Sequence, residues 1–117
     1  AVGTVASGAN SQRRSGSGHA SWLVFPESAE DVLAGPSARW GVTADTGTEK
    51  EHGFCPTCGT PVFLTFPGQA GLVAVHAASL DDPSRFAPVL VTWGSTAQGW
   101  DRLDPALTVF PKMPPRA

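Results

Sequence analysis

Short apolar stretches alternate with polar stretches that contain Gly and Pro along the whole chain of 117 residues. The apolar stretches are rich in β-branched and aromatic residues, which pack well on a pleated sheet. They predict strands over residues 20–25, 39–43, 49–54, 61–66, 72–77 and 89–93. Turn-forming residues recur about every ten residues, which is typical of antiparallel strands joined by short turns. The pattern therefore predicts a mainly β fold, a small antiparallel β domain.

Helical structure is expected only as one or two short turns. Residues 27–33 carry acidic side chains near their start, where these favour the helix dipole. Residues 81–86 offer Asp82 as an N-cap and Pro83 at the first helical position. Residues 1–18 are rich in Gly and Ser and poor in bulky apolar side chains, which predicts a loop or mobile N-terminal arm. The length fits a single domain over residues 1–117.

Charge and composition argue against several classes of partner. The formal net charge is −2, and no basic run is longer than the pair Arg13-Arg14, so a nucleic-acid partner is not expected. No apolar run approaches the roughly 20 residues that cross a bilayer, so no membrane association is expected. The first 18 residues lack the apolar stretch of a secretion signal, and the expected location is cytoplasmic.

The chain has two cysteines, Cys55 and Cys58, in a Cys-Pro-Thr-Cys-Gly turn. Such a turn directs two thiolates at one ion, while a structural zinc ion needs four ligands, so the pair forms half a zinc site at most. Two alternatives stay open: a pair without metal, as thiols or a simple disulfide, and a redox-active pair. The redox alternative is weakened because no βαβ pattern surrounds the cysteines.

Three histidines and two tryptophans are further candidates. His76 lies in an apolar strand, which favours a structural imidazole over a ligand, and His52 is expected to be a solvated strand residue. His19 follows the Gly/Ser-rich stretch and is placed to face a pocket. Trp93 and Trp100 are expected in the core, with the walls of a cleft as the alternative.

Four segments match, in order and spacing, the landmarks of one known family, and the match spans about residues 6–114. The chain resembles the glutathione-dependent formaldehyde-activating enzyme family, which also includes centromere protein V. The segments are Arg13 with Ser15-Gly16; residues 53–61; residues 78–83 with Phe86 and Pro88; and Trp100 with Asp104, Leu107, Phe110 and Pro114.

The resemblance implies an Mss4-like β fold with a structural zinc and, in active members, a second, catalytic zinc. The reaction implied is that of a carbon–sulfur lyase, which joins glutathione to formaldehyde as S-hydroxymethylglutathione. The family's structural zinc is held by an N-terminal C-x-C turn together with the pair that matches Cys55 and Cys58. The catalytic zinc is held by three cysteines, whose positions fall here on Ala6, Gly8 and Ser11. Few residues precede Ala6, so the first C-x-C turn is missing as well.

Three interpretations of these departures are open: a degenerate member, an enzyme with another reaction in the same cleft, or a sequence that lacks an N-terminal segment. The last does not explain Ala6, Gly8 and Ser11, so degeneracy is favoured. Arg13, Ser15 and His19 are the candidate substrate-binding residues, with Arg13 able to hold a carboxylate of a glutathione-like ligand. The alternative function is a non-catalytic binding or interaction module that keeps the fold.

Overall fold

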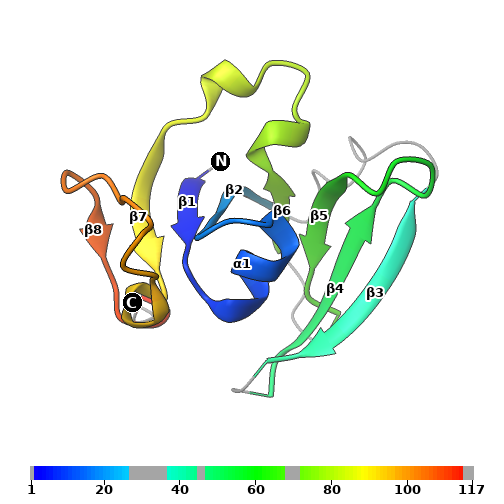
Figure 1. Cartoon of the computed structure of the whole chain (residues 1–117). Helices are drawn as coiled ribbons and strands as arrows, with labels where there is room; N and C mark the ends of the chain where they lie inside the picture. The colour runs from blue at the N-terminus through cyan, green and yellow to red at the C-terminus, as the bar shows by residue number, and fades with distance from the viewer. Residues whose placement is uncertain (1, 27–36, 45–46, 68–71, 115–117) are drawn as a thin grey trace.

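The computed structural model describes residues 2–26, 37–44, 47–67 and 72–114, and β-strands dominate it (Figure 1). The predicted mainly β class is confirmed. The strands are β1 (Val2–Ala6), β2 (Ala20–Pro26), β3 (Ala38–Thr43), β4 (Glu49–Phe54), β5 (Pro61–Thr65), β6 (Leu72–His76), β7 (Pro88–Thr92) and β8 (Thr108–Val109). One α-helix, α1 (Ala9–Ser15), and the 3-10 turns η2 (Ala77–Ser79), η3 (Pro83–Arg85) and η4 (Gly94–Thr96) complete the elements of these residues.

The described strands form one sheet in the order β3-β4-β5-β6-β2-β1-β7-β8. Most neighbours pair antiparallel, as expected, whereas β7 runs parallel to both β1 and β8. Parallel neighbours need long connections, and here the helix α1 and several strands separate β1 from β7 in the sequence. The sequence pattern, which indicates local turns, did not predict these parallel strand pairs.

The prediction of a loop or mobile arm over residues 1–18 is wrong for most of that stretch. β1 is an inner strand that pairs with β2 on one side and β7 on the other, so two neighbours stabilise it despite its small side chains. The helix α1 ends at Gly16, whose φ of 71° is left-handed and suits a residue without a Cβ. The amino-acid composition did not indicate β1 or α1, because strand pairing and packing, not local apolar content, stabilise these two elements.

The sheet curls around α1, which lies in front of β2 and between the β1–β7 and β3–β5 portions in Figure 1. In a flat sheet, β3 and β7 would lie about 29 Å apart at the usual strand spacing. A helix of this length spans only about 10 Å. Nevertheless, α1 contacts Trp40 of β3 through Arg14 and bonds to Thr96, just beyond β7, through Gln12. The concave face of the sheet therefore encloses the helix.

The concave face carries one half of the core. The register places Trp22, His52, Leu64, Ala74 and His76 on this face. Ala20, Trp22, Leu64 and Ala74 form a buried apolar cluster there, with Ala6, Val24 and Phe66 packed against it. Residues of opposite register, including Phe63, Val73, Val75 and Val91, are buried on the other face. The strands thus bury residues of both faces, which explains their continuous apolar runs.

Several local predictions can be compared directly with the structure. The Asp82 cap is confirmed, because its side chain accepts a hydrogen bond from the backbone N–H of Ser84, and Pro83 begins η3. The predicted strands at 20–25, 39–43, 49–54, 61–66, 72–77 and 89–93 are confirmed to within one or two residues at their ends. The helical turn predicted over residues 27–33 lies outside the described residues.

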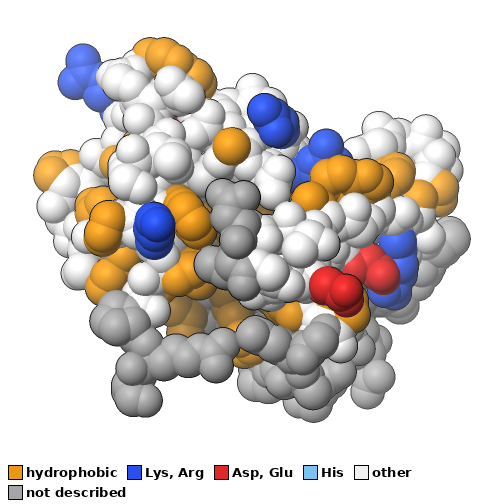
Figure 2. Space-filling view, turned by 90° about the horizontal axis from the view of Figure 1, so that it is seen from below, with side chains coloured by type: hydrophobic (Ala, Val, Ile, Leu, Met, Phe, Trp, Pro, Cys, Tyr) orange, Lys and Arg blue, Asp and Glu red, His pale blue; other side chains and the backbone are white. Residues whose placement is uncertain are grey.

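The surface is mixed in character. Figure 2 shows hydrophobic side chains spread between polar areas on one face, with Lys and Arg side chains at several separate places. The large hydrophobic side chains exposed among the described residues are Val2, Trp40, Leu72, Val89, Trp100, Val109 and Met113. Among the residues that the structure describes, no helix has both the length and the apolar character to span a membrane.

Candidate functional site

The three positions that the resemblance assigned to catalytic cysteines lie at the corner between β1 and α1. Ala6 is the last residue of β1, Gly8 is the N-cap of α1, and Ser11 lies in the first turn of the helix. A Cβ atom at Gly8 would lie 3.5 Å from Cγ of Trp93, which is ordinary contact, so the position has room for a Cβ. The three side chains are a methyl group in Ala6, a hydrogen in Gly8 and a hydroxymethyl group in Ser11, none of which is a thiolate.

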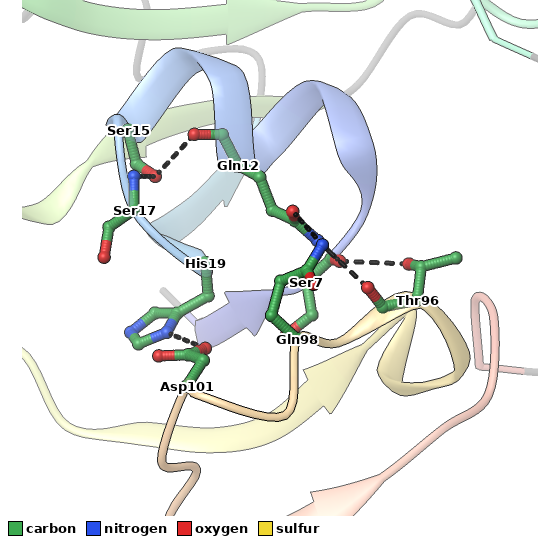
Figure 3. Close-up of polar contacts among 8 residues, drawn as sticks. All are labelled: Ser7, Gln12, Ser15, Ser17, His19, Thr96, Gln98 and Asp101. Atoms are coloured by element: carbon green, nitrogen blue, oxygen red, sulfur yellow. Dashed lines mark hydrogen bonds and ion pairs between the residues drawn. The ribbon is translucent and has the colours of Figure 1, made fainter.

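Hydrogen bonds to the backbone hold this corner against the segment after β7 (Figure 3). The Gln12 amide nitrogen donates to the carbonyl oxygens of Ser7, at 2.8 Å, and Thr96, at 3.0 Å. The Thr96 hydroxyl also donates to the Ser7 carbonyl, at 3.0 Å, and Gln98 donates to the Gln12 side-chain oxygen, at 3.1 Å. The sequence analysis missed Gln12 and Thr96, because residues 84 positions apart give no local signal of contact.

Arg13 and Ser15 lie in the last turn of α1 and are both exposed. The Ser15 hydroxyl donates to the Gln12 carbonyl at 3.2 Å and accepts from the backbone N–H of Ser17 at 3.1 Å. Ser15 therefore helps to end the helix. Arg13 and Ser15 are two positions apart in the helix, so their side chains point in different directions.

His19 forms an ion-pair contact with Asp101, with 2.7 Å between Nδ1 and Oδ2 (Figure 3). The Asp101 side chain is about 10% exposed and packs against Gly18, where an added Cβ would approach the Asp101 Cγ to 2.3 Å. Gly18 thus lets the C-terminal segment approach β2 closely. The His19 ring joins that segment to the sheet, a contact that the sequence did not indicate.

The turn that carries Cys55 and Cys58 joins β4 to β5. It is closed by backbone hydrogen bonds from Cys55 to the Thr60 carbonyl, at 2.9 Å, and from Gly59 to the Cys55 carbonyl, at 2.8 Å. Gly59 has a φ of 77°, which favours glycine. Both cysteines are free, with Cys55 half-buried and Cys58 exposed. Hydrogen bonds from the side chain and backbone of Thr60 lower the pKa of the Cys58 thiol.

Two histidines and two tryptophans on the concave face form, with Arg14, a group that we call the imidazole cluster: Arg14, Trp22, Trp40, His52 and His76. The Trp22 and His76 ring centroids are 3.9 Å apart, and the Trp40 and His52 rings stack at 5.7 Å. The guanidinium of Arg14 lies 4.7 Å from the centre of the Trp40 ring. The cluster therefore connects α1 with strands β2, β3, β4 and β6.

The expectation of a solvated His52 is wrong. Its side chain is buried, with 5% of the residue exposed, and neither ring nitrogen has a hydrogen-bond partner. A buried polar group without a partner costs about 1–3 kcal/mol. Burial, with Arg14 and Lys50 as further causes, lowers the pKa of His52 to about 4. Burial also lowers the pKa of His76 to about 4, with His52 and Arg14 as further causes. Both rings are therefore neutral at pH 7.

The sequence model of the glutathione-dependent formaldehyde-activating enzyme family matches residues 6–96. The match includes the β1–α1 corner, the imidazole cluster and the cysteine turn. The chain belongs to this family. A separate comparison with curated proteins gave no match.

The described residues of this chain do not fit the two zinc ions that the resemblance implied. Among the residues that the structure describes, no group of three or more His, Cys, Asp or Glu side chains could hold a metal ion. Ala6, Gly8 and Ser11 offer no thiolate at the catalytic positions. Cys55 and Cys58 supply two of the four ligands of a structural zinc. No chemical step can therefore be assigned here to a zinc ion held by three thiolates.

Proposed function

We propose that this chain binds small thiol adducts of the glutathione type and has lost the zinc-dependent carbon–sulfur lyase step. Membership in the family supports a function of the formaldehyde-activating type. One observation supports the loss of the step: the positions that the resemblance assigns to the zinc-binding cysteines hold Ala6, Gly8 and Ser11, and none of these side chains supplies a thiolate. A cytoplasmic location is part of the proposal, since free thiols suit a reducing compartment.

The reaction to be tested joins the glutathione sulfur to the formaldehyde carbon, while the thiol proton moves to the carbonyl oxygen. We expect glutathione to bind but S-hydroxymethylglutathione to form at the uncatalysed rate, because no zinc-bound thiolate can be activated. NMR exchange measurements of adduct formation, with and without protein, check this result. A rate clearly above the uncatalysed one would contradict the loss of the catalytic step.

A matched comparison restores the missing ligands. The triple variant Ala6→Cys, Gly8→Cys, Ser11→Cys should gain about one zinc ion per chain, because three thiolates at a corner of this kind complete an open zinc site. Elemental analysis of the purified variant measures the gain.

If glutathione does not bind the unaltered chain, and a protein partner stabilises it in a thermal-shift screen, the interaction-module alternative replaces this proposal.

The cysteine turn leads to a separate prediction about metal content. We expect freshly purified protein to contain substoichiometric zinc, because two thiolates complete only half of a tetrahedral site. Cys58→Ser should change the free energy of unfolding by less than about 1 kcal/mol, since Cys58 is exposed. Elemental analysis and urea unfolding with and without a chelator check both points. Stoichiometric zinc whose removal destabilises the chain would contradict them.

A further inference from the structure

The imidazole cluster contains a buried polar group that the fold leaves unpaired. His52 is more than nine-tenths buried, and both of its ring nitrogens lack a hydrogen-bond partner. Buried polar groups in native proteins are nearly always hydrogen-bonded, and an exception calls for a ligand, an ion or a water molecule at that place. The Trp40 ring, which stacks on His52, is 43% exposed, so the cluster extends from the interior to the surface.

The charge around His52 shows which kind of ligand suits the cluster. Arg14 lies over the Trp40 ring, and no carboxylate among the described residues forms an ion pair with it. Burial lowers the pKa of His52 most, and the cationic side chains of Arg14 and Lys50 lower it further. A metal cation placed beside His52 would be repelled by these two charges, whereas an anion would be attracted. The surroundings of His52 therefore favour an anion over a metal.

We propose that Arg14 and His52 form a recognition site for a carboxylate group of a small organic ligand, with Trp40 and Trp22 as its aromatic wall. A guanidinium binds a carboxylate through two parallel N–H donors, and a neutral imidazole provides a third donor. The identity of the ligand as a glutathione-type molecule rests on the proposed function above. The site itself rests on the contacts of the imidazole cluster, and it assigns to Arg14 the role that the sequence analysis gave to Arg13.

A carboxylate bound beside His52 makes ligand binding depend on pH. The charged and titratable groups that face His52 are Arg14, Lys50 and His76. A bound carboxylate favours the imidazolium, so it raises the pKa of His52 above its value of about 4 in the free protein. Binding then takes up protons, and we expect affinity to increase as the pH is lowered from 7 to 5.

The experiment compares two ligands and three arginine variants by isothermal titration calorimetry. We expect Arg14→Gln to bind glutathione at least tenfold more weakly than the unaltered chain does. Glutathione diethyl ester, whose carboxylates are blocked, should bind the unaltered chain as weakly as glutathione binds Arg14→Gln. Arg85→Gln removes an equal charge from the exposed turn η3 and should leave the affinity unchanged. If Arg13→Gln weakens binding and Arg14→Gln does not, the proposal is overturned.

A second measurement keeps the test valid if substitution of His52 unfolds the chain. In the unaltered protein, the ¹⁵N shifts of the His52 ring should move when glutathione is added, and Arg14→Gln should abolish the movement. If glutathione binds while these shifts and the Arg14→Gln affinity stay unchanged, the carboxylate site is wrong and the proposed function stands. If glutathione does not bind but succinate moves the His52 shifts, the carboxylate site stands and the proposed function fails. If neither acid binds, both are wrong.

Discussion

Lowering the pH from 7 to 5 should strongly destabilise this domain, because two buried imidazoles resist protonation in the folded state. The pKa values of His52 and His76 are lowered from an ordinary value of 6.5 to about 4. The unfolded chain therefore binds more protons between these values, and stability falls as the pH falls. The contribution is fully present above pH 6.5 and is lost progressively toward pH 4.

The expected loss is large relative to the stability of a small domain. At about 1.4 kcal/mol per pKa unit, each imidazole accounts for about 2 kcal/mol of destabilisation by pH 5. Small domains have a total stability of about 5–15 kcal/mol. Urea unfolding at pH 7, 6 and 5, followed by tryptophan fluorescence, measures the change. Most carboxyl groups titrate below this range, so they contribute little.

The single variants His52→Gln and His76→Gln provide the control for this effect. Each should remove about half of the pH dependence between pH 7 and 5, because each removes one titrating group. An unfolding free energy that is the same at pH 7 and pH 5 would show that the two rings are not buried as neutral groups. A pH dependence that survives the removal of both histidines would assign the effect to other residues.

Trp22→Ala is expected to be the most damaging single substitution at an aromatic residue. Trp22 is 4% exposed, lies in the apolar cluster of the concave face and packs on His76. Replacing a buried tryptophan by alanine costs about 3–5 kcal/mol, because apolar burial is lost and a cavity remains. Urea unfolding at pH 7 measures this cost, and Trp22→Phe should recover part of it.

Trp100→Ala is the matched control for that prediction. Trp100 is 67% exposed, so its removal should change the free energy of unfolding by less than about 1 kcal/mol. The pair of variants separates tryptophans that stabilise the core from those on the surface. Equal costs for Trp22→Ala and Trp100→Ala would contradict the placement of Trp22 at the centre of the concave face.

The site could be predicted only in part from the sequence. The resemblance assigned three ligand positions to Ala6, Gly8 and Ser11, and the structure places these residues at the end of β1, at the N-cap of α1 and in the first turn of α1. The resemblance gave a candidate role to Arg13 and none to Arg14, and adjacent residues of one type have no local pattern that distinguishes them. The helix α1 gives the two side chains different surroundings. Arg14 contacts Trp40 on the curled sheet, and Arg13 is exposed to solvent.

The sequence by itself determined the strands β2 to β7, the Asp82 cap, the cysteine turn and the family. These features depend on neighbouring residues, through β-propensity, turn conformation and motif spacing. Only the tertiary structure decided that β1 lies between β2 and β7, that α1 is enclosed by the sheet and that His52 is buried. The physical reason is that strand pairing and sheet curvature join residues far apart in the chain, and a local pattern carries no information about such contacts.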